Sequence, residues 1–514
     1  MYLQVVEGLK LSARPGAAPL LKQVSRFLAG EGIRSYLVGG FVRDALLGRE
    51  TADIDIAVAA DAPAVAARAA AALGGRYVLL DEANGVGRVV LPGTGQNDRW
   101  EIDFSRLRGD ITRDLAQRDF TVDALAVDLE DLVHIPEEGE LGLRASAIID
   151  PLHGRDDLER RLIRAVSETA FTSDAARLLR AVRLAAELGF SIDSGTEWLI
   201  RQHCHLIAGV AGERVREELL RLLALPGAGQ TLAYLDELGL LTAIFPELAP
   251  ARGVAQPVVH FWDVFSHSIE TVNTVEYLLR QSPWQYGAGW VLAEVPWSAD
   301  LSRHFEREVS SGSTGQEMLK LAALLHDIAK PATKTVDPDG RARFTGHPAE
   351  GATMAAGIME RLRFSSREAK LVETLVKHHL RPGQMSNYGL PSPRAIYRYF
   401  RDTGEAGIDI LFFSLADHLA TRGPNLDPAG WREHAQLVAY VLQQHRQEKH
   451  LTIPPKIIDG HDLMAVFGLP PGPEIGRLLE AVHEAQAAGE VISREEALAY
   501  AGRLLSSPHN KRDS

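Results

Sequence analysis

Three aspartates early in the chain have the spacing of a metal-binding carboxylate set. Asp53 and Asp55 alternate with isoleucines, and Asp103 lies between two large apolar residues. This alternation predicts two half-buried strands whose carboxylates project from one face. Carboxylates gathered on one face repel one another unless cations neutralise them, and Mg²⁺ prefers oxygen ligands. We therefore expect Asp53 and Asp55 to bind Mg²⁺ and Asp103 to be the third carboxylate of the same site.

A double glycine precedes these aspartates, where an apolar strand gives way to a short helix. Gly39 and Gly40 allow the backbone to approach a ligand closely, and the N–H groups of a helix start attract phosphate oxygens. A glycine pair by itself is more often only a turn. Here the glycine pair is significant because Arg43 and Asp44 follow one helical turn later, and because the aspartate strand comes next. The pattern indicates a phosphate-binding turn beside the metal site.

A second ordered set of metal-ligand residue types lies in the later half of the chain. An apolar helix ends at His326-Asp327, His267 lies upstream, and Asp417 lies downstream in another apolar helix. The intervening candidates are His347, His378 and His379. A lone histidine is usually a core residue, but a complete ordered set favours metal binding. The single cysteine excludes a cysteine-rich zinc module, so histidines and carboxylates must supply the ligands.

Strand and helix signals are distributed unevenly along the chain. Short alternating segments and helices are mixed in the first part, and helical spacing replaces the strand signals from about residue 156 onward. We expect the α+β class, with a small mixed-sheet head followed by helical domains. The expected boundaries are 1–150, 151–250, 251–425 and 426–514.

Composition and charge narrow the class of protein. The chain has 514 residues, 46% of them hydrophobic, with a net charge of −13. No signal peptide and no apolar run long enough for a bilayer is evident, so we expect a cytoplasmic protein without membrane contact. The acidic balance disfavours indiscriminate nucleic-acid binding, so any RNA contact must be local. One basic region, residues 155–183, contains seven arginines; it is either an RNA contact or a helix face balanced by nearby acids.

The head motifs together resemble a known family. Residues 37–48, followed by Asp53 and Asp55, are similar to the first motif of class II tRNA CCA-adding nucleotidyltransferases and bacterial poly(A) polymerases, in the DNA polymerase beta superfamily. The resemblance implies phosphoryl transfer with two Mg²⁺ ions, in which Asp53 and Asp55 hold the ions and Asp103 assists. The residues that would face the nucleotide triphosphate are Gly39, Gly40, Arg43 and Asp44.

Four later segments extend the resemblance through residue 219. Residues 118–125 resemble the ribose-contacting motif, with Arg118 and Asp119 as readers of the 2′-hydroxyl. Residues 150–158 resemble the hinge between head and neck, and residues 213–219 resemble the helix that supports base selection. Residues 174–183 resemble the base-selecting helix itself, with nucleotide-binding positions at Asp174, Arg177, Arg180 and Arg183.

Base selection has a physical rationale in this helix. Asp174 and Arg177 are three residues apart, so an acceptor and donors lie on one helix face. Cytosine and adenine both present an amino donor beside a ring-nitrogen acceptor, whereas uracil and guanine present a carbonyl there. The sequence departs from the family pattern at Gln117, Asp123 and Ser173. Ser173 removes a glutamate that could orient Arg177, and Asp123 brings a charge near the ribose.

The histidine-rich set resembles the signature of HD-superfamily phosphohydrolases. The resemblance implies a site for Mn, Ni, Fe or Mg whose ligands are His267, His326, Asp327, His347, His378 and Asp417. Such a domain either hydrolyses 2′,3′-cyclic or terminal phosphates or supports RNA. Residues 459–476 resemble the terminal module of long family members, which either contacts an RNA phosphate or caps the HD domain. The four expected domains are thus head, neck, HD domain and tail.

The sequence therefore favours an enzyme that adds CMP and AMP from CTP and ATP to tRNA or other RNA 3′ ends. Within this class the alternatives are an A-adding enzyme and a poly(A) polymerase. Outside it they are an HD phosphohydrolase with a vestigial head and a non-catalytic RNA-binding protein. The intact head aspartates disfavour a head without catalytic activity. The intact histidine set disfavours an HD domain with a purely structural role. The sequence sets no oligomeric state.

Overall fold

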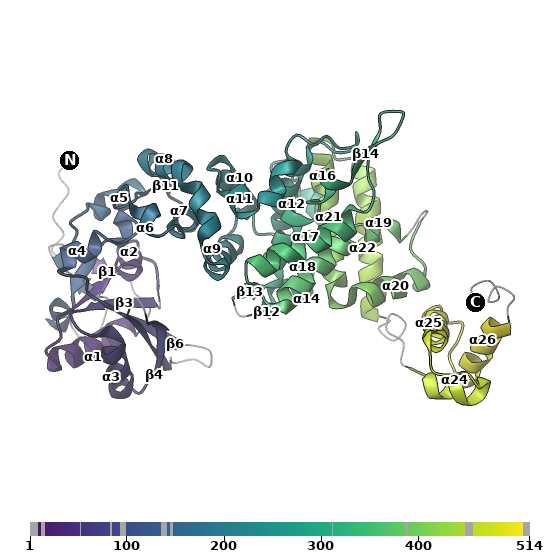
Figure 1. Cartoon of the computed structure of the whole chain (residues 1–514), viewed down its shortest axis with the longest axis horizontal. Helices are drawn as coiled ribbons and strands as arrows, with labels where there is room; N and C mark the ends of the chain where they lie inside the picture. The colour runs from purple at the N-terminus through teal and green to yellow at the C-terminus, as the bar shows by residue number, and fades with distance from the viewer. Residues whose placement is uncertain are drawn as a thin grey trace. The chain divides into compact units, whose positions relative to one another are not determined.

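The computed structural model contains two compact units, coloured from purple to yellow in Figure 1. It describes residues 9–11, 16–51, 53–82, 85–92, 99–134, 141–143, 147–310, 312–385, 389–447 and 456–506. The first unit comprises Met1–Val210 with Leu238–Leu240, and the second comprises Ala211–Glu237 with Leu241–Ser514. The division at residue 210 falls inside the expected neck, so the four-domain organisation remains a prediction.

A seven-stranded mixed sheet forms the core of the first unit, as expected for an α+β head. Its spatial order is β4-β5-β6-β3-β2-β7-β9. Within it β3 and β6 run parallel, and the remaining neighbours are antiparallel. The strands are β2 (Ser35–Val38), β3 (Asp53–Val58), β4 (Arg76–Asp81), β5 (Val86–Pro92), β6 (Arg99–Arg106), β7 (Ala126–Asp128) and β9 (Ile148–Ile149).

Alternation along β3 and β6 gives the sheet one buried and one open face. Ile54, Ile102 and Phe104 are buried, whereas the polar residues between them remain accessible. Helix α3 (Ala62–Leu73) packs against β4, β5 and β6 and also contacts α1 (Ala17–Gly30). The carboxylate of Asp61 caps α3 by accepting from the Ala64 N–H at 3.1 Å. Burial of the apolar face thus directs the aspartates to the opposite face.

Short helices complete the first unit after the sheet. Helix α2 (Gly40–Leu46) follows the double glycine directly. The later helices are α4 (Ile111–Leu115), α5 (Gly154–Arg160), α6 (Ala170–Ser173), α7 (Arg177–Leu188) and α8 (Ser194–His203). Helix α7 is strongly amphipathic and buries Leu178, Leu179 and Val182. Of its arginines, Arg183 is also buried, whereas Arg177 and Arg180 are partly exposed.

The expectation of helices alone after residue 156 was wrong at three places. Two-stranded ladders form between β10 (Leu162–Ile163) and β11 (Ser191–Ile192), between β12 (Glu308–Ser310) and β13 (Ser313–Thr314), and between β14 (Lys334–Val336) and β15 (Ala342–Phe344). Strands of two or three residues are too short to show a period of two, so sequence alternation cannot reveal them.

A helical bundle forms most of the second unit. Helix α12 (Val264–Leu278) lies at its centre and contacts α10 (Ala228–Glu237), α15 (Gly315–Leu325) and α21 (Gly407–Arg422). Around them pack α9 (Gly212–Ala224), α17 (His347–Arg361), α18 (Ser366–His378) and α22 (Pro428–Gln447). No described helix is both long and apolar enough to cross a bilayer.

A buried ion pair ties α9 and α10 to the bundle. The ammonium of Lys320 donates to Glu276 Oε1 at 3.0 Å and to the Leu223 carbonyl at 2.7 Å. The carboxylate of Glu276 accepts from the N–H groups of Ala228 and Gly229 at 3.0 and 3.2 Å. Buried charges require such complete pairing, so the start of α10 is fixed against α12 and α15.

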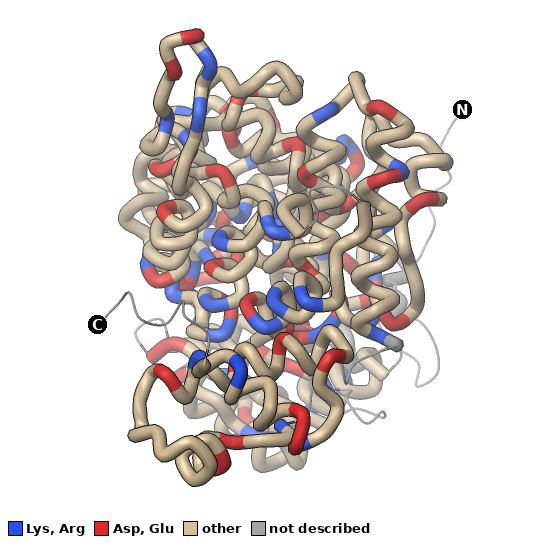
Figure 2. Tube along the Cα trace, turned by 90° about the vertical axis from the view of Figure 1, so that its right-hand side faces the viewer, with Lys and Arg blue, Asp and Glu red and all other residues tan. Residues whose placement is uncertain are grey.

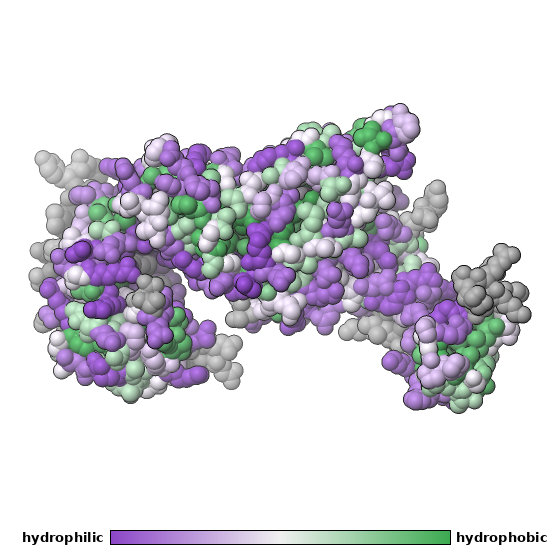
Figure 3. All heavy atoms as spheres, viewed as in Figure 1, coloured by the Kyte–Doolittle hydropathy of each residue, from purple (hydrophilic) through white to green (hydrophobic). Residues whose placement is uncertain are grey.

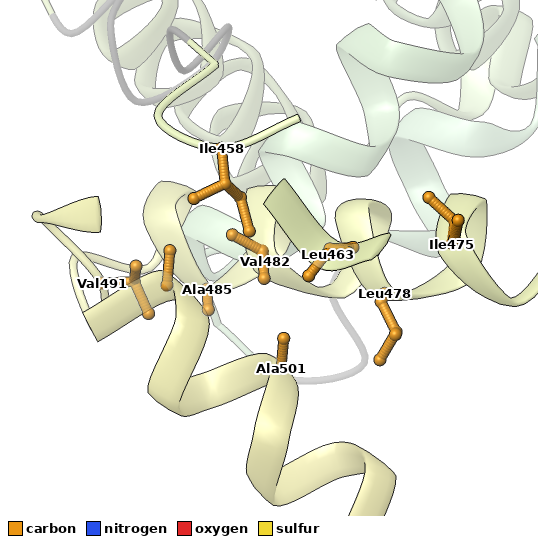
Figure 4. Packing of buried hydrophobic residues seen from close by; sticks show 9 residues of the cluster. Ile458, Leu463, Ile475, Leu478, Val482, Ala485, Val491 and Ala501 are labelled. Atoms are coloured by element: carbon orange, nitrogen blue, oxygen red, sulfur yellow. The ribbon is translucent and has the colours of Figure 1, made fainter. Parts of the chain in front are cut away.

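The last part of the second unit has a core of its own. Helices α24 (Gly460–Phe467), α25 (Pro473–Ala487) and α26 (Arg494–Ser506) bury Leu463, Leu478 and Val482 between them (Figure 4). Its link to the bundle is charged: arginines of α20 (Pro393–Thr403) form ion pairs with Glu480 and Glu484 of α25 and with Glu490 just after it. In Figure 3 hydrophobic residues cover part of this segment's visible face.

Candidate functional site

The open face of the first unit's sheet brings two of the predicted aspartates side by side. Asp55 on β3 pairs directly with Asp103 on β6, and Asp53 pairs with Glu101 in the same parallel ladder. Asp53 is exposed at the start of β3, two residues before Asp55 and therefore on the same face. The structure thus places all three carboxylates on one face of two adjoining strands.

The electrostatics of Asp55 favour a bound cation. Burial raises the pKa of Asp55 to about 6, and the neighbouring carboxylates of Asp103 and Asp53 act in the same direction. The guanidinium groups of Arg118 and Arg180 act against this rise. The raised pKa means that the surroundings stabilise the ionised carboxylate poorly. A divalent cation bound beside Asp55 would stabilise its ionised form. The donor set therefore fits Mg²⁺, which prefers carboxylate oxygens.

Gly39 gives the turn beside Asp55 its shape. Its φ of 73° lies in the region that favours glycine, and its N–H donates to the Leu125 carbonyl at 3.2 Å. A Cβ at this position would lie 2.8 Å from Arg118 Nη1 and 3.4 Å from Asp55 Oδ2. Absence of a side chain therefore lets the Arg118 guanidinium approach the Asp55 carboxylate.

Arg43 is engaged inside the protein. It is buried, with Nη1 2.6 Å from Asp123 Oδ1 and Nε 2.9 Å from Asp44 Oδ1. Its guanidinium also lies 3.5 Å from the position that a Cβ on Gly40 would take. Asp123, where the family usually has asparagine, thus provides the charge that neutralises Arg43. In this structure Arg43 and Asp44 stabilise the turn, and their contact with a nucleotide remains a prediction.

A cavity of about 330 Å³ opens beside the two central aspartates. Six predicted residues line it, namely Asp55, Asp103, Arg118, Asp119, Arg177 and Arg180. The other seven predicted residues lie outside its lining, namely Gly39, Gly40, Arg43, Asp44, Asp53, Asp174 and Arg183. Residues that the sequence analysis did not assign to the site also line it: Val86, Ser105, Arg106, Arg108, Asp114 and Gln117. The cavity joins the carboxylates to the start of α7.

Arg177 is held at the cavity by several acceptors. Its Nη1 lies 3.3 Å from the carbonyls of Arg118 and Ala170 and from Ser173 Oγ, and its Nη2 donates to the Gln117 carbonyl at 3.0 Å. Ser173 stands where a glutamate could orient Arg177. Its hydroxyl accepts from the guanidinium, so the serine is itself a partner of Arg177.

The other predicted nucleotide readers have distinct surroundings. Burial acts to raise the pKa of Asp119, but the guanidinium groups of Arg180 and Arg177 outweigh it and hold that pKa below its usual value. Arg180 Nε lies 2.8 Å from Asp119 Oδ2. Asp174 accepts from the Ala176 N–H at 3.2 Å and has extended backbone before α7 begins at Arg177, so the expectation that both lie on one helix face was wrong. Arg183 is buried and pairs with Glu187 at 2.5 Å, which gives it a structural contact within α7.

The second unit gathers the predicted histidines and aspartates at one buried point. His267 Nε2 lies 3.0 Å from Asp417 Oδ1, and His326 Nε2 lies 3.0 Å from Asp327 Oδ2. His347 Nε2 lies 3.3 Å from Asp327 Oδ1. Two groups have metal-ligand geometry, His267 with His326 and Asp327, and Asp327 with His347 and His379. Asp327 belongs to both.

The histidine rings are oriented as metal ligands require. The Nδ1 atoms of His326, His347 and His379 lie 2.7–2.8 Å from backbone carbonyls, so each Nε2 points to the aspartates. The Nε2 atoms of His267 and His326 and both oxygens of Asp327 are buried and lack a hydrogen bond of good geometry. Buried polar atoms normally have such a partner, so a metal ion fits this donor set.

His379 occupies the place that the sequence analysis gave to His378. His379 is buried with its Nε2 3.4 Å from His347 Nε2, whereas His378 lies outside both donor groups. Successive helical residues differ by about 100° in direction, so only one of two adjacent histidines can face the site. Burial and the nearby His326 lower the pKa of His379 to about 3, which favours the neutral imidazole that binds metal.

A cavity of about 430 Å³ leads to this donor set. Its lining includes Asp327, His347, His379 and Asp417, together with basic residues that the sequence analysis did not assign: Lys330, Arg341 and Arg343. Lys330 Nζ lies 2.6 Å from both Asp327 Oδ2 and Gln256 Oε1. The three-residue spacing from Asp327 was the signal for Lys330, because residues i and i+3 share a helix face.

Sequence models of four families match the chain. They are the poly(A) polymerase head domain at residues 35–164, an RNA- and SrmB-binding site of polymerase A at 189–252, the HD domain at 264–422, and tRNA nucleotidyltransferase domain 2 at 433–501. The head model spans Asp53, Asp55 and Asp103, and the HD model spans the complete histidine and aspartate set.

Curated relatives cover nearly the whole chain. An A-adding tRNA nucleotidyltransferase of Deinococcus radiodurans is 36% identical, over 91% of this chain and 94% of the relative. A CC-adding tRNA nucleotidyltransferase of Thermus thermophilus is 34% identical, over 91% of this chain and 92% of the relative. A CCA-adding enzyme of Geobacillus stearothermophilus is 35% identical, but over only 43% of this chain and 53% of the relative.

Solved structures with the same fold cover similar lengths. A CCA-adding enzyme in its apo form matches with a TM-score of 0.60 and 19% identity, over 97% of this chain and 96% of that structure. A Thermotoga maritima CCA-adding enzyme complexed with tRNA matches with a TM-score of 0.57 and 20% identity, over 96% of this chain and 97% of that structure. At these identities the similarity establishes the fold alone.

The donor geometry predicts how two adjacent histidines differ in metal binding. Substitution His379→Ala removes a buried imidazole aimed at Asp327, and we expect loss of at least about tenfold in divalent metal affinity. His378→Ala, the matched control, should retain the metal content of the unchanged protein. Metal content after dialysis against Mn²⁺ or Ni²⁺, measured by mass spectrometry, checks both variants. Equal losses in the two variants would contradict the assignment of His379.

Proposed function

Because the chain belongs to the tRNA nucleotidyltransferase family, we propose that its head transfers nucleotides from CTP and ATP to the 3′ end of tRNA. The observation that carries the proposal is the register of Asp55 with Asp103 beside the Gly39 turn, at the mouth of the cavity. Bound Mg²⁺ ions supply charge neutralisation at the α-phosphate and lower the pKa of the attacking 3′-hydroxyl. Asp53, Asp55 and Asp103 hold these ions.

The remaining cavity residues orient the substrates. We assign to Arg118 and Asp119 the recognition of the ribose, since both line the cavity next to the carboxylates. Arg177, with its guanidinium orientation fixed by backbone carbonyls, presents donors to the base at the same opening. With Asp174, three residues before Arg177, as the acceptor, cytosine and adenine would satisfy both groups, and uracil and guanine would leave polar groups unpaired. Gly39, Gly40, Arg43 and Asp44 form the turn at the triphosphate.

RNA binding must be local, given the net charge of −13. Figure 2 shows basic and acidic residues interspersed along the trace on the face that it presents. We propose that tRNA is held by shape along its acceptor arm, with local arginines near the cavity supplying the phosphate contacts. A role in tRNA maturation places the protein in the cytoplasm.

Restricted nucleotide addition is a second candidate within the class. Relatives that align over nine-tenths of this chain include A-adding and CC-adding enzymes, whereas CCA-adding relatives of Geobacillus and one CC-adding relative align over less than half of it. Addition of CC alone or of the terminal A alone is therefore the second candidate beside addition of all three nucleotides.

The HD domain carries a further candidate activity. Two three-ligand groups that share Asp327 fit a phosphohydrolase centre for Mn, Ni, Fe or Mg, and Lys330, Arg341 and Arg343 add positive charge at its cavity. We propose hydrolysis of 2′,3′-cyclic or terminal phosphates by metal-activated water. Opening of a 2′,3′-cyclic nucleotide to its 2′- or 3′-monophosphate, assayed with each metal in turn, should reveal activity with at least one. Inertness with all four would overturn this assignment.

Three tRNA substrates separate the candidate specificities. Purified protein is offered tRNAs that end before the CCA, after C and after CC, with CTP and ATP in separate reactions. A complete CCA-adding enzyme extends the first two with CTP and the third with ATP. Extension of only the third marks an A-adding enzyme, and extension of only the first two marks a CC-adding enzyme. Gel analysis of the products checks the outcome, and no incorporation into any tRNA would overturn the proposed function.

Removal of a metal-binding carboxylate tests the chemistry directly. Substitution Asp55→Asn keeps the side-chain shape but removes the charge, and we expect kcat to fall about 10³-fold or more, because the metal supplies several kcal/mol of charge stabilisation. Asp61→Asn, a conservative change at the exposed cap of α3, is the matched control and should leave kcat unchanged. Single-nucleotide incorporation kinetics measure both variants. Unchanged incorporation by Asp55→Asn would contradict the two-metal mechanism.

A further inference from the structure

Arg88 lies next to the carboxylates on the open face of the head sheet. In β5 it pairs with Asp103 of β6, which in turn pairs with Asp55 of β3. The three residues therefore form one row across three adjacent strands. Side chains directly opposite on one face lie within contact distance of each other. Arg88 is thus the next residue in line beyond the predicted metal-binding pair.

The guanidinium of Arg88 holds Asp103 through both of its oxygens. Arg88 Nε donates to Asp103 Oδ1 at 2.7 Å, and Nη2 donates to Oδ2 at 2.9 Å. Arg88 Nη1 also pairs with Glu101, which in turn accepts from Arg99. Two parallel charge-assisted bonds fix the plane of a carboxylate as one bond cannot. The orientation of Asp103 is therefore set by Arg88.

The Asp103 carboxylate keeps unused acceptor sites that face the cavity. Asp103 lines the 330 Å³ cavity with Asp55, whereas Arg88 is not among the lining residues. A carboxylate offers about four acceptor sites, and the bidentate arginine uses two of them. The guanidinium thus approaches from the side and leaves the remaining sites for a ligand in the cavity.

We propose that Arg88 is a positioning residue for nucleotide transfer, which fixes the orientation of the Asp103 carboxylate toward the ion that Asp103 and Asp55 share. The proposal rests on the proposed function of the head. It assigns to Arg88 no contact with nucleotide or RNA, because its guanidinium is committed to Asp103 and Glu101. A lysine at this position would keep the charge but lose the second bond that fixes the carboxylate plane.

The positive charge of Arg88 gives the proposal a signature that a merely structural role lacks. A cation beside Asp103 repels a metal ion bound to the same carboxylate. Removal of the guanidinium should therefore strengthen metal binding, while it frees Asp103 to rotate and slows the chemical step. Loss of fold or of local packing would instead weaken metal binding and activity together.

Arg88→Met, Arg88→Lys and a control, Arg99→Met, test the proposal in the full-length protein. Arg99 pairs with the same Glu101, its side chain is largely exposed, and it lies four residues before Asp103 in β6. Two quantities are measured: kcat and KM for single-nucleotide incorporation, and Mn²⁺ affinity from the electron paramagnetic resonance signal of free Mn²⁺. The affinity is measured without RNA, in the presence of a CTP or ATP analogue whose α–β bridge does not react, and in a His379→Ala background that weakens Mn²⁺ binding at the HD centre.

We expect kcat of Arg88→Met to fall about 10- to 100-fold, as for other residues that orient a metal ligand. Its KM for nucleotide should remain within about twofold, since only the transition state loses an interaction. Mn²⁺ affinity should rise roughly fivefold from the lost repulsion. Arg88→Lys should recover part of kcat and show wild-type Mn²⁺ affinity, and Arg99→Met should match the wild-type protein in both.

Two results would overturn the proposal. One is a kcat of Arg88→Met equal to that of the wild-type protein. The other is a parallel loss of kcat and Mn²⁺ affinity, which would make Arg88 a structural support of β5. Failure of the proposed function is distinguishable, because it would show as absent incorporation by the wild-type protein itself.

Discussion

The head is organised around the repulsion between two carboxylates that the sheet holds in register. Asp55 and Asp103 cannot separate, because their strands pair over six residues and their apolar neighbours are buried beneath them. Burial and mutual repulsion raise the pKa of Asp55 to about 6. Positive charge must therefore be supplied at this point, and the surrounding structure supplies it from Arg118, Arg180 and Arg88, with room left for metal ions.

Three arginines of the head each bind a defined partner, either an aspartate or backbone carbonyls. Arg88 orients Asp103, Arg43 neutralises Asp123 below the glycine turn, and Arg177 is fastened to backbone carbonyls at the start of α7. The cavity lining holds five arginines together with four aspartates, in a protein whose net charge is −13. This arrangement suits an enzyme that must attract a triphosphate and an RNA end to one point without binding nucleic acid elsewhere.

The second unit also holds a donor set for metal ions, made mainly of histidines. Asp327 lies between two ligand groups, and the histidines use backbone carbonyls to point their Nε2 atoms inward. The HD centre and the nucleotidyltransferase centre belong to separate compact units, each with its own donor set. Each centre can therefore be disabled by substitutions that leave the ligands of the other intact.

Residue periodicity was sufficient to predict five strands of the sheet, the aspartate face and most of the histidine set, but not the short strands β7 and β9. Alternation alone places Asp53, Asp55 and Asp103, because a strand has only two faces. It could not identify Arg88, whose role depends on which residue of β5 lies opposite Asp103. Strand register is set by turns and packing that one sequence does not reveal. The exchange of His379 for His378 has a similar origin, since adjacent helical residues differ only in direction.

Anomalous diffraction from crystals soaked with Mn²⁺ and a non-reactive nucleotide triphosphate tests the central claim most directly. The account predicts two anomalous peaks on the open face of β3 and β6, at roughly 2.0–2.3 Å from carboxylate oxygens of Asp53 and Asp55. One of these peaks should also contact Asp103. Peaks confined to the HD centre, with the head carboxylates unliganded beside a bound nucleotide, would contradict it.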